Sequence, residues 1–398
     1  MVDFDKLIDR RGTYCTQWDY VADRFGQEDL LPFTISDTEF AVPEEVLEAL
    51  YSRMSHKVFG YTRWNNGDFQ QSVLNWYERR FDFLPDADWL LYSPSVIYSV
   101  AQLIQMKSNE GEGVIIQTPA YDAFFKTIKG NNRVIVENPL TYEEHYYSID
   151  FENLEKKLAD PNNTILLFCS PHNPTGRVWT KEELTRIVDL CKKHEVFLIS
   201  DEIHMDVISK GFKHIPITKI TTEQVGLVTS GSKTFNFPGL IFSYLMLPNS
   251  DDRELFLYQL KNKDGLSSTS ILGMEATMSA YNNSEKWVND LNTYLEGNKN
   301  LVKKFFTNNY EGVKIVPTEA TYLMWVDISS LGLNMEELQE RLINIGKVAI
   351  MDGEVYGGNG GQFLRLNIGC PEAKLVEGFK RIEKSLKDID LKKCDIIK

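Results

Sequence analysis

Short apolar runs alternate with segments of helical spacing between residues 89 and 233, and this alternation constrains the fold more than any other feature. The runs that predict strands cover residues 89–92, 113–118, 134–136, 164–170, 196–200 and 225–229. Several are almost continuously apolar, as parallel strands buried on both faces are. Strands and helices that alternate in this way predict an α/β fold, with a mostly parallel central sheet and helices on both faces.

The pattern changes after residue 244, where helical spacing dominates. Helices are predicted at 251–261, 271–281 and 287–306, strands at 322–326 and 363–368, and a last amphipathic helix near 375–386. This order indicates a second, smaller α+β domain. We expect an N-terminal segment (1–50) that joins the small domain, a large domain (51–285) and a small C-terminal domain (286–398).

The charge balance excludes several classes of partner. Among 398 residues, 57 are acidic and 43 are Lys or Arg, so the formal charge is -14 and no basic surface for nucleic acid or an anionic membrane is expected. No apolar run reaches the length of a membrane span, and the acidic start of the chain lacks the apolar core of a signal peptide. We expect a cytoplasmic protein that acts on a small molecule.

The five cysteines are scattered and lack the spacing of metal ligands. They are Cys15, Cys169, Cys191, Cys370 and Cys394. Their odd number and wide separation argue against a disulfide framework and against a zinc site. We therefore expect a reducing compartment and no bound metal.

Polar residues follow four of the predicted strands at their C-terminal ends. They are Tyr121, Asn173, Asp201 and Lys233. Open α/β sheets bind ligands at this edge, where the carboxyl ends of parallel strands meet. A carboxylate such as Asp201 is costly to hold at the end of a buried strand unless a cation or a hydrogen-bond donor faces it. We expect these four side chains to converge on one site.

Two segments could bind a phosphate group. In the run Ser230-Gly231-Ser232-Lys233-Thr234, small residues surround the lysine, and the hydroxyls of Ser230 and Ser232 can approach anionic oxygens. The second segment is a predicted helix start whose first backbone N–H groups are free. These groups belong to Ser95, Val96 and Ile97. Each feature by itself is equally consistent with an ordinary loop lysine or an ordinary helix start.

Taken together, these residues match the requirements of pyridoxal phosphate (PLP). The cofactor needs a lysine that forms a Schiff base with its aldehyde, an acid that keeps its ring nitrogen protonated, a phosphate cradle and a group near its phenolic oxygen. Lys233 and Asp201 would supply the first two, Asn173 would bind the phenolic oxygen, and Tyr121 would stack on the ring. Lys233 would then serve as the general base.

The motifs also resemble those of a known family. Asn173-Pro174-x-Gly176, Asp201 and Ser232-Lys233 occur in the same order as in the fold-type-I PLP enzymes of aminotransferase class I/II. The runs at 60–62, 170–179, 200–204, 232–236 and 365–367 are similar to those of the cystathionine β-lyase-like carbon–sulfur lyases of the MalY/PatB type. The resemblance extends over essentially the whole chain, and the combination is more specific than any single motif.

The resemblance implies a homodimer in which Tyr61 reaches the phosphate of the neighbouring active site. It also implies that Arg365 binds the α-carboxylate of an amino-acid substrate, which a guanidinium fork suits well. Asp37 and Tyr121 are expected beside that substrate. From the residues alone, Arg365 could equally belong to a structural ion pair.

Two features indicate the lyase branch of the family. His204 stands three residues after Asp201, where ordinary aminotransferases carry tyrosine, and no arginine follows Lys233 until Arg253. We expect His204 among the cofactor contacts, either as a functional group or as a packed ring. The chain departs from the lyase pattern at residues 34–38, at Ser95, at Phe237-Pro238 and at Gly369-Cys370, which leaves the preferred substrate side chain open.

The expected reaction is β-elimination. A carbon–sulfur lyase of this kind cleaves cystathionine, cysteine or related S-substituted cysteines to a thiol, pyruvate and ammonia. An aminotransferase of the same family is the nearest alternative, because both reactions begin with removal of the Cα proton. A regulatory or binding protein that retains the fold is a third possibility, although the sequence contains no recognisable DNA-binding module.

Overall fold

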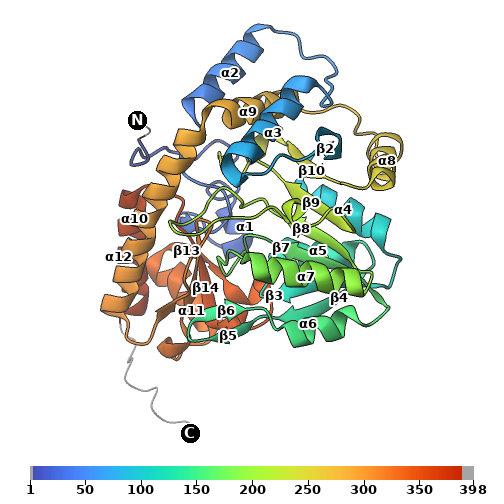
Figure 1. The fold of residues 1–398 in the computed structure, drawn as a ribbon. Helices are drawn as coiled ribbons and strands as arrows, with labels where there is room; N and C mark the ends of the chain where they lie inside the picture. Colours follow the sequence, from blue (N-terminus) through green and yellow to red (C-terminus); the bar gives the residue numbers. More distant parts are fainter. Residues whose placement is uncertain (1–2, 388–398) are drawn as a thin grey trace.

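The computed structural model describes residues 3–387, which form two main sheets and one small hairpin (Figure 1). The large sheet has the order β2 (Leu90–Ser93), β10 (Ser243–Met246), β9 (Val225–Thr229), β8 (Phe197–Asp201), β7 (Asn163–Cys169), β3 (Gly113–Thr118), β4 (Val134–Pro139). All of its pairs are parallel except those that β10 makes with β2 and β9. This confirms the mostly parallel sheet predicted from the alternating pattern.

The register of the large sheet brings strand ends to one level. Cys169 at the end of β7 pairs with Asp201 at the end of β8, and Asp201 pairs with Val228 of β9. The segments that follow these strands therefore leave the sheet along the same edge. β10 was not predicted as a strand: no α-helix separates it from β9, and its other antiparallel partner, β2, lies about 150 residues earlier in the chain.

Helices cover both faces of the large sheet, with α7 in front of it and α4 behind it in the view of Figure 1. The helices of this part are α3 (Gly67–Phe81), α4 (Val96–Lys107), α5 (Asp122–Gly130), α6 (Phe151–Leu158), α7 (Lys181–Lys193), α8 (Ser250–Tyr258) and α9 (Ile271–Asn283). Their starts follow local sequence signals: Ser95 caps α4, and Thr180 and Glu183 form a capping box at α7. Within residues 3–387, no helix is both long enough and apolar enough to cross a bilayer.

The small sheet combines the N-terminal and C-terminal parts of the chain. Its order is β1 (Leu31–Phe33), β13 (Val348–Asp352), β14 (Phe363–Asn367), β12 (Leu323–Asp327), β11 (Lys314–Ile315), and β1 is parallel to β13. Its helices are α11 (Met335–Arg341) and α12 (Glu372–Leu386). The hairpin of β5 (Thr141–Glu143) and β6 (Tyr146–Ser148) contacts this part through Tyr142, whose hydroxyl donates to Asp327.

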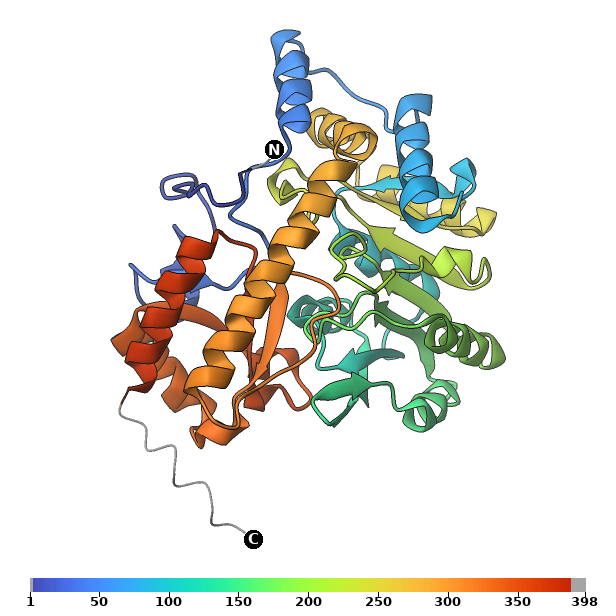
Figure 2. The ribbon, with the colours of Figure 1, turned by 60° about the vertical axis from the view of Figure 1, so that its left-hand side comes forward.

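A long helix, α10 (Glu285–Asn309), extends from the large sheet to α12 of the small part, as Figure 2 shows. The division at 285/286 therefore coincides with the start of one helix. The division at 50/51 falls inside α2 (Glu44–Ser55), which packs against α9 of the large part. We propose the same three parts with the first boundary moved before α2, because a helix is not divided between two packing units. Cys394 lies outside the described residues.

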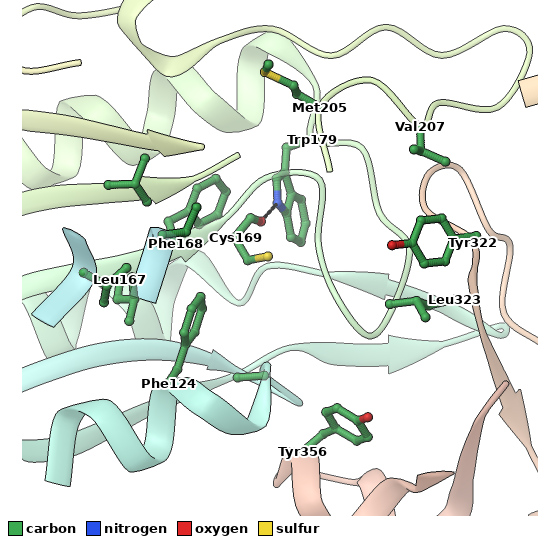
Figure 3. Packing of buried hydrophobic residues seen from close by; sticks show 14 of the residues in the cluster. Phe124, Leu167, Phe168, Cys169, Trp179, Met205, Val207, Tyr322, Leu323 and Tyr356 are labelled. Atoms are coloured by element: carbon green, nitrogen blue, oxygen red, sulfur yellow. Dashed lines mark hydrogen bonds between the residues drawn. The ribbon is translucent and has the colours of Figure 1, made fainter. Parts of the chain in front are cut away.

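The hydrophobic core continues to the edge where the strands end (Figure 3). Trp179, in the loop after β7, is buried, and its indole N–H donates to the carbonyl of Cys169 at 2.9 Å. The ring of Trp179 also packs on Phe168, with centroids 5.6 Å apart. This packing holds the loop that contains Asn173 against its own strand, so the position of that amide is set by the core.

Candidate active site

A cavity of about 220 Å³ lies at the carboxyl ends of β7, β8 and β9. It encloses every predicted cofactor contact except Tyr61, namely Ser95, Val96, Ile97, Tyr121, Asn173, Asp201, His204, Ser230, Ser232 and Lys233. These residues come from segments that are far apart in sequence. The parallel arrangement of the strands brings them together, as expected from the positions of the strand ends.

Lys233 follows β9, is half-buried and lines the cavity. Its Nζ donates to the backbone carbonyl of Ser36 at 2.7 Å. Burial lowers the pKa of the ammonium group, and Arg365 lowers it further, whereas Asp37 and Asp201 oppose the change. A lowered pKa favours the neutral amine, which is the form that attacks a carbonyl carbon and accepts a proton.

Asp201 is the last residue of β8 and lines the same cavity. Burial raises the pKa of its carboxyl group to about 7; Glu202 adds to the rise, while the N–H of Ile203 and the charge of Lys233 oppose it. The N–H of Ile203, at 3.1 Å from Oδ1, is the side chain's hydrogen-bond donor within residues 3–387. The carboxyl therefore lacks the cationic N–H partner that its burial calls for.

Arg365 on β14 is buried, and its guanidinium makes two hydrogen bonds within the described residues, both to neutral acceptors. Nη1 donates to Oδ1 of Asn173 at 3.1 Å, and Nη2 donates to the carbonyl of Thr34 at 2.9 Å. Nε is buried without a hydrogen-bond partner in the part of the chain that the structure describes. A buried guanidinium with no carboxylate beside it is suited to an anionic ligand. Because Arg365 donates to the amide oxygen of Asn173, the amide nitrogen of Asn173 remains available to a ligand in the cavity.

The start of α4 and the loop after β9 form the polar end of the cavity. Ser95 accepts a hydrogen bond from the N–H of Tyr98 at 3.1 Å, so its side chain caps α4 while the N–H groups of Val96 and Ile97 precede the first helical bonds. A helix of this length presents partial positive charge at that end. The arrangement is suited to a phosphate group.

The two serines of the loop after β9 differ in their contacts. The hydroxyl of Ser230 donates to the carbonyl of Phe242 at 2.7 Å and accepts the N–H of Ser232 at 3.1 Å. The hydroxyl of Ser232 has no such partner among residues 3–387. Ser232 is thus the available donor for an anion, and Ser230 instead stabilises the shape of the loop.

Tyr121 and His204 provide aromatic surface around the cavity. Tyr121 is half-buried, and burial raises the pKa of its hydroxyl. His204 is buried, and burial lowers the pKa of its imidazole to about 3, with further lowering by Lys233 and Arg365. The ring of His204 is consequently neutral at physiological pH, and its Nδ1 has no hydrogen-bond partner within the described residues.

Two predicted residues lie apart from the cavity. The carboxylate of Asp37, which is predicted to lie beside the substrate, accepts hydrogen bonds from Arg10 at 2.7 Å and Gln17 at 2.9 Å, and its charge acts on Lys233 although Asp37 does not line the cavity. Two donors from the N-terminal segment therefore determine its orientation. Tyr61 is fully exposed in the loop before α3 and does not line the cavity of its own chain.

Some residues of the site were missed in the sequence. The carbonyl of Ser36 accepts hydrogen bonds from both Lys233 and Tyr322, the latter at 2.9 Å. Ser36 belongs to residues 34–38, where the chain departs from the lyase pattern, whereas the only sequence signal at Tyr322 is its place in a predicted strand. Backbone acceptors leave no mark on the sequence, because every residue has one.

Comparisons with known proteins agree with this geometry. A model of the family aminotransferase class I and II matches residues 28–382. Protein MalY of Escherichia coli (strain K12) is 45% identical over 378 residues, which are 95% of this chain and 97% of that protein. The cystathionine beta-lyase PatB of Bacillus subtilis (strain 168) is 36% identical over 388 residues, which are 97% of this chain and 100% of that protein.

Two solved structures have the same fold over nearly their whole length. A PLP-bound putative aminotransferase from Clostridium difficile 630 has a TM-score of 0.94 and 35% identity, covering 97% of this chain and 100% of that chain. Cystalysin from Treponema denticola has a TM-score of 0.92 and 34% identity, covering 98% and 99% respectively. The resemblance expected from the motifs is confirmed, and this chain belongs to the aminotransferase class I and II family.

Proposed function

We propose that this chain is a PLP-dependent carbon–sulfur β-lyase, which converts cystathionine, cysteine or a related S-substituted cysteine to a thiol, pyruvate and ammonia. The observation that carries the proposal is that one cavity is lined by both Lys233, an amine of lowered pKa, and Asp201, a buried carboxyl without a cationic partner among the described residues. The similar proteins from Bacillus subtilis and Treponema denticola are named a cystathionine beta-lyase and a PLP-containing cystalysin.

The residues of the cavity fit PLP at each end. A protonated ring nitrogen would supply the N–H partner that the buried Asp201 lacks, and Asn173 has an amide nitrogen free for the phenolic oxygen. The N–H groups of Val96 and Ile97 and the hydroxyl of Ser232 would bind the phosphate. Tyr121 and His204 would contact the ring, and the neutral imidazole adds no charge beside it.

Two side chains of the protein, Arg365 and Lys233, would then carry out the elimination. Arg365 binds the substrate carboxylate, which places Cα beside Lys233. When bound, PLP withdraws electrons from the substrate and so makes the Cα proton acidic. Lys233 removes that proton, the Cβ–S bond breaks with both electrons on sulfur, and the thiolate takes up a proton. Water hydrolyses the remaining three-carbon enamine to pyruvate and ammonium.

Product analysis tests this function. Purified protein supplied with PLP and L-cystathionine should release pyruvate and free thiol in equal amounts without any keto acid in the assay. Pyruvate can be followed with a coupled dehydrogenase and thiol with a chromogenic disulfide. If amino-group transfer occurs only when a keto acid is added and no thiol is released, the protein is an aminotransferase and the lyase proposal is wrong.

Replacing Arg365 with lysine should weaken substrate binding. A lysine retains the charge, but it cannot reproduce the two-pronged contact with a carboxylate or the bond to Asn173. We expect KM for cystathionine to rise by about 10- to 100-fold, consistent with about 1.4–3 kcal/mol for a charge-assisted contact. Steady-state kinetics measures this effect. An unchanged KM would contradict the assignment of the substrate carboxylate to Arg365.

We also propose a homodimer in which Tyr61 contacts the neighbouring active site. Tyr61 is fully exposed, and Tyr51, Val58 and Phe59 expose 68%, 61% and 54% of their surface in the same region of the chain. An exposed apolar cluster of this kind is typical of an interaction surface. Sedimentation velocity should give a dimer, and Tyr61→Phe should raise the Kd for PLP while the dimer persists. A monomer with full activity would contradict both parts.

A cytoplasmic location is proposed on the basis of the cysteines. Cys15, Cys169, Cys191 and Cys370 are all free and buried. Burial raises the pKa of Cys169, and the pKa of Cys191 and of Cys370 to about 12, so these thiols are unreactive. Unpaired thiols are usual in reducing compartments.

A further inference from the structure

A second cavity, of about 600 Å³, opens from the active site toward the N-terminal segment. It shares Ser36, Tyr121 and Lys233 with the active-site cavity described above, which we call the inner cavity. Arg365 also lines the second cavity. We refer to it as the outer cavity. Its far side is formed by residues 16–25, which include the short helix α1 (Val21–Phe25). The outer cavity therefore connects the groups that bind the reacting end of a substrate to a wall with its own charged side chains.

Arg24 is the cationic side chain of that wall. It is 46% exposed, and its Nη1 donates to the sulfur of Met351 at 3.0 Å. A thioether is a weak acceptor. Its Nη2 lies 3.9 Å from Oδ2 of Asp122, but that carboxylate already accepts a hydrogen bond from Lys126 at 2.8 Å. Most of the donors of Arg24 are thus left for another acceptor.

The chemistry of elimination determines which part of a substrate enters the outer cavity. Lys233 lines both cavities, whereas Arg365 lines only the outer one. If Arg365 binds the α-carboxylate and Lys233 faces Cα, we expect the substituent on sulfur to extend into the outer cavity. This step rests on the function proposed above. It places the end of the leaving group near α1.

We propose that Arg24 binds a carboxylate at the far end of the leaving group, so that the enzyme prefers S-substituted cysteines whose thiol product is an acid. Arg24 forms a fork of donors suited to a carboxylate. The adjacent Asp23 also lines the outer cavity, and its carboxylate would suit an ammonium group when the leaving thiol is itself an amino acid. Arg24 is then a specificity-determining residue, which acts on binding of the leaving group and takes no part in bond breaking.

Two substrates of nearly equal shape test this inference. S-(2-carboxyethyl)-L-cysteine and S-(2-carbamoylethyl)-L-cysteine differ only in a terminal carboxylate or amide, and both yield pyruvate. The wild-type protein should favour the acid by about tenfold in kcat/KM, mainly through a lower KM. The effect is no larger because solvent partly screens a half-exposed charge pair. In Arg24→Gln the preference should fall to about one, with the amide substrate unaffected. Arg24→Lys should keep an intermediate preference.

Arg11→Gln is the matched control. Arg11 lies on the same N-terminal segment, pairs with Asp9 and does not line the outer cavity, so its loss should leave the preference unchanged. An equal loss of kcat/KM for both substrates in Arg24→Gln would show a structural effect and overturn the inference, as would an unchanged preference. If the wild-type protein releases no pyruvate from these two substrates or from L-cystathionine, the lyase function itself is refuted.

Discussion

Replacing Lys233 with alanine should abolish both the yellow colour of the purified protein and its release of pyruvate. The amine lies in the cavity that Asp201 also lines, and desolvation lowers its pKa, which favours the neutral form that attacks an aldehyde. Among residues 3–387, no other lysine lines that cavity. Absorbance spectroscopy and the pyruvate assay measure the two losses, and we expect turnover to fall by at least about 10³-fold because the general base is removed as well.

Lys210→Ala is the matched control for this experiment, because Lys210 is exposed and far from the cavity lining. It should keep both colour and activity. Borohydride reduction followed by peptide mass spectrometry should locate PLP on Lys233 in the wild-type protein. A reducible attachment that persists in Lys233→Ala would contradict the assignment. Circular dichroism of Lys233→Met separates loss of chemistry from loss of folding.

Asp201→Asn should fold but turn over about 10²- to 10³-fold more slowly. An amide cannot balance the charge of a protonated ring nitrogen, so the electron withdrawal needed for removal of the Cα proton is lost. Burial raises the pKa of the Asp201 carboxyl to about 7, so this group is poised to exchange a proton with a bound base. Steady-state kinetics with saturating PLP measures the effect. Near-normal kcat would contradict the proposed role.

The same substitution should stabilise the protein once PLP has been removed. With a pKa of about 7 in the folded chain and 3.8 as the reference, the folded state binds more protons than the unfolded state between these values. Stability of the wild-type protein therefore falls as pH rises through that window, and it is lowest above pH 7. The asparagine side chain does not ionise, so Asp201→Asn does not lose stability in this way. At pH 8 its free energy of unfolding should exceed that of the wild-type protein by up to about 4 kcal/mol.

The gain should shrink by about 2 kcal/mol when the pH is lowered from 8 to 5.5, since the wild-type carboxyl is then largely protonated. Urea unfolding of the cofactor-free proteins at the two pH values measures it. Asp189→Asn, at an exposed position of α7, should show no such pH-dependent gain. A gain at Asp201 that does not vary with pH would mean that desolvation of the carboxylate is not its cause.

Local patterns predicted most of the large sheet. The inner parallel strands β3, β7, β8 and β9 are buried, so their apolar runs stand out. The helices between them carry their own caps, as at Thr180. The strands that escaped prediction are short or pair with distant segments: β1 with β13, and β10 with β2. Their pairing depends on partners far away in the chain, which no local window contains.

The sequence by itself determined which residues end the parallel strands, and therefore that Asn173, Asp201 and Lys233 share one site, because parallel strand ends meet at a single edge. The tertiary structure alone decided how loops from elsewhere close that site. It turned Asp37 toward Arg10, placed the carbonyl of Ser36 on Lys233, and opened the outer cavity beside α1. Side-chain direction and backbone acceptors follow from packing between distant segments, and such packing leaves no periodic trace in a sequence.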